Sequence, residues 1–204
     1  MAIINQATKE LQVKIVFYGP ARGGKTTNLE QVHGNLQNTR DKGNLVSLAT
    51  SSDRTLFFDF LPIEAMSIKG FKTKFQLYTV PGQVIYNTTR QLVLRGVDGI
   101  VFVADSQYDK MAENVSSFQN LEENLKSHRL SLGEIPYVLQ YNKRDLPNAA
   151  PVEYMEFLLN NRELQVPFIE ASAFRCEGVF ETLNLISRLL LHKFVNEAGR
   201  KPAP

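Results

Sequence analysis

The segment Gly19-Pro-Ala-Arg-Gly-Gly-Lys-Thr26 joins two stretches of opposite character. Residues 13–18, which come before it, are a short apolar run of the kind that forms a buried β-strand. Residues 25 to about 36, which follow it, are compatible with a helix. The order of strand, glycine-rich loop and helix predicts the first unit of an α/β fold.

This alternation continues along the chain. The further strand candidates are residues 45–48, 56–62, 71–80, 98–104, 137–141 and 166–169. The further helix candidates are residues 83–94, 111–128, 152–160 and 179–195. Strands that alternate with helices predict a mainly parallel central sheet with helices on both faces, and ligands then bind beyond the carboxyl ends of the strands. We expect a single domain over residues 1–198 and a disordered tail over residues 199–204.

The composition argues against several classes of protein. The 204 residues are 43% hydrophobic and 22% charged, which is ordinary for a globular domain. The net charge of +2 is spread along the chain without the basic cluster that nucleic-acid binding needs, so no nucleic-acid partner is expected. No apolar stretch reaches the roughly 20 residues that span a bilayer, and the single cysteine, Cys176, cannot form an internal disulfide. We therefore expect a cytoplasmic protein with no integral membrane segment.

Residues 19–26 match the pattern G-x-x-x-x-G-K-[ST] at every fixed position, in the strand-loop-helix context that the pattern requires. Glycines let backbone N–H groups close around phosphate oxygens, and the start of the helix adds partial positive charge. Lys25 is expected to reach the β- and γ-phosphates, and Thr26 offers a hydroxyl to Mg²⁺. Arg22 either contacts phosphate or points to solvent. The pattern predicts the fold of a P-loop NTPase.

The phosphate loop alone does not name the nucleotide, but Asn142-Lys-Arg-Asp145 does so at the end of a strand candidate. Asp145 can accept hydrogen bonds from guanine N1–H and the exocyclic amine, Asn142 can donate to N7, and the stem of Lys143 can pack over the ring. Adenine would leave the carboxylate unpaired, which discriminates strongly against it. Glu170-Ala-Ser-Ala173 follows the next strand candidate, where a backbone N–H can bond guanine O6 and Ser172 shapes the loop.

These motifs resemble those of the Ras-like small GTPase superfamily, over essentially the whole of residues 13–195. Four segments are more similar still to the bacterial MglA family of gliding-motility and cell-polarity GTPases: Asp53-Arg-Thr-Leu-Phe-Phe-Asp-Phe-Leu-Pro62, Gly70-Phe-Lys-Thr73, Tyr78-Thr-Val-Pro-Gly-Gln83 and Tyr141-Asn-Lys-Arg-Asp-Leu-Pro147. The resemblance implies a G domain that binds GTP or GDP with Mg²⁺. It also implies a molecular switch that hydrolyses GTP to GDP and phosphate, slowly without an activating partner.

The motifs and the resemblance together predict the residues of the site. The expected nucleotide-binding residues are Gly19, Ala21, Arg22, Gly23, Gly24, Lys25, Thr26, Thr27, Thr55, Gly82, Asn142, Lys143, Asp145, Ser172 and Ala173. Thr26 and Thr55 are the expected ligands of Mg²⁺. The expected catalytic residues are Gln83, Arg54 and Lys25.

Thr79 departs from the Ras-like pattern, which generally has Asp at this position to order Mg²⁺ through water. The hydroxyl of Thr79 can still orient a water molecule, but it carries no charge, so Mg²⁺ should be held less firmly than by a carboxylate. Gln83 remains in place to orient an attacking water. Arg54 is either a cis arginine finger, which the resemblance favours, or a solvated loop cation.

The resemblance also implies partners. These are a GTPase-activating protein, expected to be a dimeric MglB-type protein that rearranges the switch segments, and effectors that read the nucleotide state. It implies a location in the cytoplasm, at a cell pole or at the inner membrane through partners. An alternative function is a nucleotide-binding interaction module with little or no intrinsic hydrolysis, for which Thr79 is the main support. A further alternative, an ATP-dependent kinase or ATPase, uses the phosphate loop but not the base motif.

Overall fold

The computed structural model describes residues 3–5, 8–36, 46–50, 54–68, 71–161 and 165–199. Within these residues eight strands form one sheet. The strands are β1 (Ile3–Asn5), β2 (Glu10–Tyr18), β3 (Val46–Thr50), β4 (Arg54–Ile68), β5 (Phe71–Thr79), β6 (Gly99–Asp105), β7 (Tyr137–Asn142) and β8 (Phe168–Glu170).

The strand order is β3-β4-β5-β2-β6-β7-β8, and β1 pairs with β2 outside this path. The pairs from β5 through β2, β6 and β7 to β8 are parallel, which confirms the prediction of a mainly parallel sheet. β3, β4 and β5 pair antiparallel. Only two residues separate β4 from β5, and a connection so short cannot make the crossover that a parallel pair needs.

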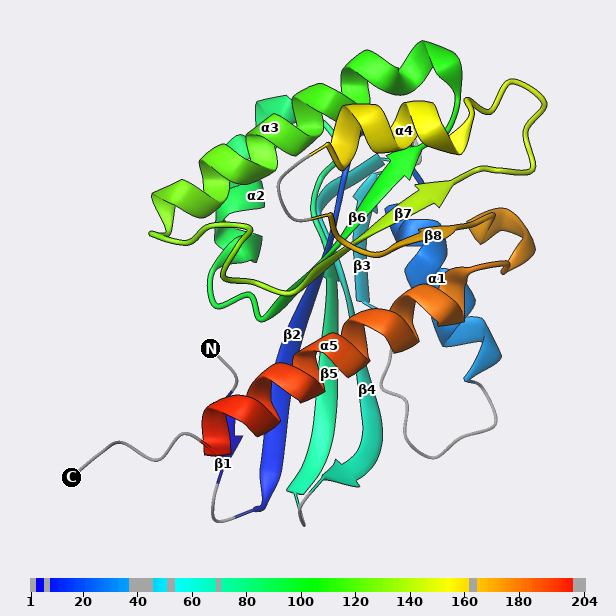
Figure 1. Cartoon of the computed structure of the whole chain (residues 1–204). Helices are drawn as coiled ribbons and strands as arrows, with labels where there is room; N and C mark the ends of the chain where they lie inside the picture. Colours follow the sequence, from blue (N-terminus) through cyan, green and yellow to red (C-terminus); the bar gives the residue numbers. More distant parts are fainter. Residues whose placement is uncertain are drawn as a thin grey trace.

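Helices cover both faces of the sheet, as expected for an α/β fold (Figure 1). They are α1 (Lys25–Asn35), α2 (Asn87–Leu94), α3 (Met111–Ser127), α4 (Val152–Leu159) and α5 (Val179–Gly199), with single 3₁₀ turns η1 (Val84–Tyr86), η2 (Tyr108–Lys110) and η3 (Ala173–Arg175). One core packs α2, α3 and α4 against one face, and a second core packs α1 and α5 against the other. Alternate residues of β6 serve the two cores, with Phe102 in the first and Val101 in the second. Every residue of β6 is buried for this reason.

β2 and β4 are longer than the apolar runs in the sequence predict. β2 begins at Glu10 rather than residue 13, because its polar start pairs side chain to side chain with β5. Lys74 forms an ion pair of 2.7 Å with Glu10, and Gln76 donates to Gln12 at 3.0 Å. β4 continues to Ile68, six residues beyond the expected end. A search for apolar runs misses such polar cross-strand pairs.

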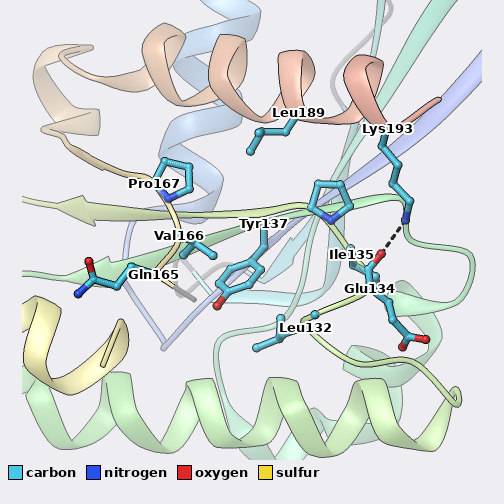
Figure 2. A pocket seen from close by; sticks show the side chains of 11 residues that line it. Leu132, Glu134, Ile135, Tyr137, Gln165, Val166, Pro167, Leu189 and Lys193 are labelled. Atoms are coloured by element: carbon cyan, nitrogen blue, oxygen red, sulfur yellow. Dashed lines mark hydrogen bonds between the residues drawn. The ribbon is translucent and has the colours of Figure 1, made fainter. Parts of the chain in front are cut away.

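The two ends of β7 have different surroundings. At its carboxyl end, Asn142 lies among the predicted site residues, whereas Tyr137 at its amino end lines a cavity of about 660 Å³. Figure 2 shows that Leu132, Val166 and Lys193 also line this cavity. None of the expected nucleotide-binding residues takes part in it, so the cavity is separate from the predicted site.

The expected tail of residues 199–204 can be compared with the structure only at its first residue. Gly199 is the last residue of α5, and residues 200–204 lie outside the described part of the chain. Of the helices that the structure describes, none has the length and apolar character needed to cross a membrane.

Candidate nucleotide-binding site

The phosphate loop runs from the carboxyl end of β2 into the first turn of α1. Gly24 has a φ of +101°, and a Cβ placed there would meet the Asn142 Nδ2 atom at 2.0 Å. Glycine is therefore required at this position both for the backbone conformation and for the close approach of Asn142. The Asn28 N–H donates to the Gly24 carbonyl oxygen at 3.0 Å, so the helix begins at the loop. This arrangement directs the amino end of α1 toward the place predicted for phosphates.

Lys25 is almost completely buried, with 6% of its surface exposed. Its Nζ donates to the carbonyl oxygens of Gly19 and Pro20, at 3.0 and 2.6 Å. Burial, followed by the nearby positive charge of Arg90, lowers the pKa of Lys25 to about 7. Both of these acceptors are neutral, and anionic phosphate oxygens would balance the positive charge of the Lys25 ammonium group.

The other expected residues of the loop differ in exposure. Arg22 is exposed with a φ of +58°, which agrees with the second of its two alternatives, that it points to solvent; its expected contact with nucleotide stays a prediction. Ala21, Thr26 and Thr27 are half-buried, and Gly23 is buried. Exposure therefore varies along the loop, from the exposed Arg22 to the buried Gly23.

A hydroxyl–carboxylate cluster of Thr26, Asp59 and Thr79 adjoins the loop. The Asp59 Oδ2 atom accepts a hydrogen bond of 2.6 Å from Thr26 Oγ1 and one of 2.8 Å from Thr79 Oγ1. The Asp59 N–H donates to Thr79 Oγ1 at 2.9 Å, and Asp59 is fully buried. The structure therefore brings a carboxylate beside the hydroxyl of Thr26 and beside the threonine that stands in place of the usual aspartate.

Asp59 was not among the residues that the sequence predicted. One signal was available, because Asp59 is the single acidic residue in the apolar run 56–61. A carboxylate in a strand with no charged neighbour needs a specific partner when it is buried. The partners lie on other elements, so only the fold identifies them.

The cluster fits Mg²⁺ by its chemistry. Carboxylate and hydroxyl oxygens are ligands that this ion prefers, and Mg²⁺ is commonly held by one or two carboxylates together with phosphate oxygens and water. Within the described residues, no group of three or more histidine, cysteine or acidic side chains gathers to hold a metal ion.

The predicted switch residues Arg54 and Thr55 belong to β4, where their backbones pair with Thr50 and Ala49 of β3. Their side chains lie outside the described part of the structure, as do residues 51–53. The expected roles in catalysis and Mg²⁺ binding stay predictions.

Gly82 and Gln83 follow β5 and lead into η1. A Cβ on Gly82 would meet the Ala21 Cα atom at 2.3 Å, so the backbone of this segment lies directly against the phosphate loop. Gln83 is half-buried and extended, with φ −84° and ψ 133°. The contact of Gly82 with Ala21 brings this segment beside the phosphate loop, and the expected role of Gln83 in orienting an attacking water stays a prediction.

Asn142 joins three of the predicted segments. Its Nδ2 donates to the Gly23 carbonyl oxygen at 2.8 Å, and its Oδ1 accepts from the Ala173 N–H at 2.8 Å. The Ala173 N–H is thus engaged by Asn142, and a backbone N–H of this loop that bonds guanine O6 stays a prediction. The second amide hydrogen of Asn142 remains for a base, because each side-chain amide has two.

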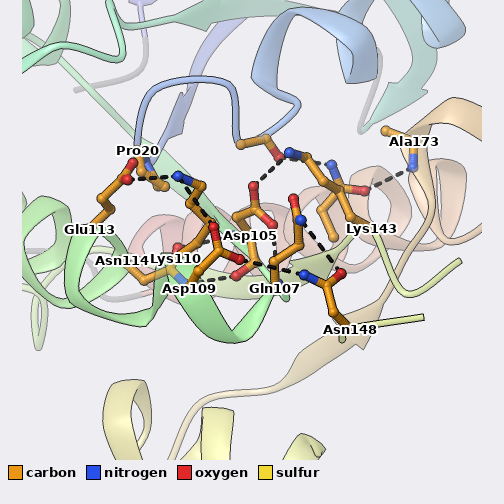
Figure 3. A network of polar contacts seen from close by, with 12 residues as sticks. Pro20, Asp105, Gln107, Asp109, Lys110, Glu113, Asn114, Lys143, Asn148 and Ala173 are labelled. Atoms are coloured by element: carbon orange, nitrogen blue, oxygen red, sulfur yellow. Dashed lines mark hydrogen bonds and ion pairs between the residues drawn. The ribbon is translucent and has the colours of Figure 1, made fainter. Parts of the chain in front are cut away.

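Lys143 has a left-handed backbone, with φ +67°, and its Nζ lies 2.6 Å from the Asp105 Oδ2 atom. Asp105 ends β6 and its side chain is 1% exposed. Figure 3 shows Lys143 and Asp105 facing each other. Asn114 binds both the N–H and the carbonyl oxygen of Asp105, at 2.9 and 2.7 Å. Asp105 was also absent from the predicted residues. It holds the ammonium group of Lys143, whose aliphatic stem was expected to pack over the base.

The remaining base-site residues lie in the adjoining loops. Asp145 is half-buried and is the third residue of the β7–α4 connection. Ser172 is buried, and its Oγ accepts a hydrogen bond from the Arg175 N–H at 3.3 Å, which supports the expectation that it shapes this loop. We call Asn142, Lys143, Asp145, Ser172 and Ala173 the base loops.

The chain is similar in sequence to several known proteins. Residues 45–192 match the model of the Ras family. The chain is 52% identical over 191 residues to "Mutual gliding-motility protein MglA" of Myxococcus xanthus (strain DK1622), which covers 94% of this chain and 96% of that protein. It is 29% identical to the dog "Ras-related protein Rab-13" and to the Saccharomyces cerevisiae "Ras-related protein SEC4", each over 68% of this chain and over 66% and 61% of those proteins. The chain therefore belongs to the Ras family, and it is a small GTPase that acts as a GTP-binding switch.

Proposed function

We propose that guanine nucleotide binds between the phosphate loop, residues 19–26, and the base loops, and that GTP is hydrolysed there to GDP and phosphate. The observation that carries this proposal is the side chain of Asn142. It binds Gly23 in the phosphate loop and Ala173 in the second base loop. A single residue thus sets the distance between the two loops, as a ligand with a base at one end and phosphates at the other requires.

Discrimination for guanine would come from Asp145, with Lys143 packed over the ring. The buried Asp105 carboxylate limits where the Lys143 ammonium can lie, so the aliphatic stem has fewer conformations to lose on binding. A carboxylate at Asp145 matches the two neighbouring N–H donors of guanine, and adenine cannot supply both.

Mg²⁺ would be held by Thr26 and Asp59, with Thr55 as a further ligand and Thr79 orienting a bound water. The bound ion supplies compensation for the charge of the β- and γ-phosphates. Asp59 provides the negative charge that Thr79 cannot. This modifies the expectation that Mg²⁺ is held weakly, because the carboxylate comes from β4 instead of from the end of β5.

Hydrolysis would depend on Gln83 to orient the attacking water and on Lys25 and Arg54 to balance charge on the departing γ-phosphate. Catalysis of this kind consists of positioning and electrostatics, so the main-chain geometry around Gln83 matters as much as its side chain.

We also propose a cellular setting, which rests on the 52% identity to a mutual gliding-motility protein. The chain would regulate cell polarity or gliding motility from the cytoplasm, at a cell pole or at the inner membrane through partners. A dimeric MglB-type protein would accelerate hydrolysis, and effectors would bind the GTP form.

The test is a hydrolysis measurement on the full chain. Protein loaded with GTP and Mg²⁺ is denatured at intervals, and the released nucleotide is separated by chromatography. We expect GDP to accumulate, more slowly by about a hundredfold in Gln83→Ala, and ATP not to compete with GTP for binding. Unchanged GTP, even with a candidate activating partner, would favour a non-hydrolysing interaction module, and equal competition by ATP would refute guanine specificity.

A further inference from the structure

Arg90 of α2 is the largest side chain that the structure buries completely. Burial of a guanidinium group is unfavourable unless its donors and its charge are compensated. In the described part of the chain no carboxylate pairs with Arg90, and its hydrogen bonds go to neutral oxygen atoms. An apolar side chain would fill the same volume without this cost, so the arginine has a purpose other than packing.

Two of its contacts reach the main chain of the segment between β5 and η1. Arg90 Nε donates to the Pro81 carbonyl oxygen at 2.9 Å, and Nη2 donates to the Gly82 carbonyl oxygen at 2.6 Å. These residues directly precede Gln83. Two parallel donors of one rigid group therefore fix the peptide planes that lead into Gln83.

The segment held by Arg90 also lies against the phosphate loop. The backbone of Gly82 approaches Ala21 so closely that even a methyl group on Gly82 would overlap it. A shift of the Gly82 carbonyl group would change this contact and the position of Gln83 together.

The other side of Arg90 is anchored on α3 and β2. Nη1 donates to Asn120 Oδ1 at 2.6 Å, and the guanidinium carbon lies 5.0 Å from the centre of the Tyr18 ring. Tyr18 Oη donates to the same Asn120 oxygen at 2.7 Å. Asn120 and Tyr18 are both buried, so the anchor is rigid.

We infer that Arg90 is a positioning residue for GTP hydrolysis, which holds the backbone before Gln83 in register with the phosphate loop through its anchor on Asn120. This inference rests on the proposed function, because it assigns Arg90 an effect that is exerted through Gln83. It predicts that loss of Arg90 slows hydrolysis more than it weakens nucleotide binding, because none of the four hydrogen bonds of Arg90 goes to the phosphate loop, residues 19–26, or to the base loops.

The experiment is a double-mutant cycle between Arg90 and Gln83. Single-turnover hydrolysis of γ-labelled GTP is measured for wild type, Arg90→Gln, Gln83→Ala and the double variant, with the dissociation rate of fluorescent GDP as a second readout. We expect Arg90→Gln to slow hydrolysis by at least about tenfold while GDP dissociation changes by less than about threefold. In the Gln83→Ala background, Arg90→Gln should cause no further loss.

Asn120 variants keep the inference testable if Arg90→Gln does not fold. Asn120→Ala removes the anchor and should slow hydrolysis by about threefold, whereas Asn120→Asp retains an acceptor for Arg90 and should restore most of the rate. Ser117→Ala, another buried polar position of α3, is the matched control and should leave the rate unchanged.

The outcomes separate this inference from the proposed function. If Arg90→Gln and Gln83→Ala act independently, or if hydrolysis and GDP affinity fall in parallel, Arg90 is only structural and the inference is overturned. If Gln83→Ala slows hydrolysis but the Arg90 and Asn120 variants do not, the inference fails while the proposed function stands. If Gln83→Ala has no effect, both assignments are wrong.

Discussion

The base loops and the hydroxyl–carboxylate cluster belong to one site, but they are held in different ways. In the base loops, Asn142 and Lys143 are tied to elements of the rigid parallel sheet and to the phosphate loop. In the cluster, the hydroxyls of Thr26 and Thr79 both bind the same oxygen of Asp59. The base loops are braced by hydrogen bonds to one another, to the phosphate loop and to Asp105, whereas the cluster consists of groups that Mg²⁺ would use.

Because the two parts of the site are held differently, we expect mutations in them to change different binding properties. A braced loop binds its ligand with little rearrangement, so changes to it should alter affinity directly. A cluster whose members bind one another must exchange those hydrogen bonds for metal contacts, so changes to it should alter the dependence on Mg²⁺. The following variants test this division, beginning with the one of largest expected effect.

Asp145→Asn should weaken GDP binding by at least about a thousandfold, because the amide places a donor against the guanine N1–H or amine. Xanthosine diphosphate, which offers an acceptor there, should bind the variant better than GDP does. Titration with fluorescent GDP and competition by the xanthine nucleotide measure both effects. Asp109→Asn, an exposed carboxylate nearby, is the control. A change in GDP affinity of less than about threefold would remove Asp145 from the base contacts.

Asp59→Asn should raise the Mg²⁺ concentration needed to retain GDP by about thirtyfold, because the cluster loses its negative charge. The measurement is the dissociation rate of fluorescent GDP across a series of free Mg²⁺ concentrations. Asp98→Asn is the matched control, since Asp98 is also buried but binds the Lys14 N–H on β2. An unchanged Mg²⁺ dependence would show that Asp59 does not serve the ion.

Asp105→Asn should speed GDP dissociation by about five- to tenfold with no change in Mg²⁺ dependence. The variant weakens the 2.6 Å contact with Lys143, which is a charge-assisted hydrogen bond to a buried carboxylate. Glu113→Gln alters an exposed carboxylate of the same polar network and should have no effect (Figure 3). If Asp105→Asn instead shifts the Mg²⁺ dependence, the two parts of the site are not independent.

Local patterns were sufficient to predict the phosphate loop and the first base loop. Each consists of neighbouring residues at fixed spacing after a strand, and the parallel sheet brings such strand ends to one edge. The comparisons confirm the predicted family, and the sheet confirms the predicted fold class.

Residues that act through distant partners could not be predicted in this way. Asp59 binds Thr26, which is 33 residues away, and Asp105 binds Lys143, which is 38 residues away. Arg90 contacts the main chain at Pro81 and Gly82, and no sequence pattern records which carbonyl groups a side chain will reach. Asp59 and Asp105 share one signal, a charged residue within or at the end of an apolar run, which indicates a partner without identifying it. Arg90 stands between the polar residues Thr89 and Gln91 and has no such signal.

The smallest expected effect concerns Lys25, which adjoins both parts of the site. Burial and Arg90 lower its pKa to about 7 in the protein, against 10.5 as the ordinary value. Between these values the unfolded chain binds more protons than the folded chain, so this group makes the free energy of unfolding rise with pH above 7 and leaves it level below 7. For nucleotide-stripped protein we expect a rise of about 1 kcal/mol from pH 7.5 to pH 8.5 in wild type relative to Lys25→Met, measured by urea unfolding. Equal slopes for the two proteins would mean that Lys25 keeps its charge through this pH range despite its burial.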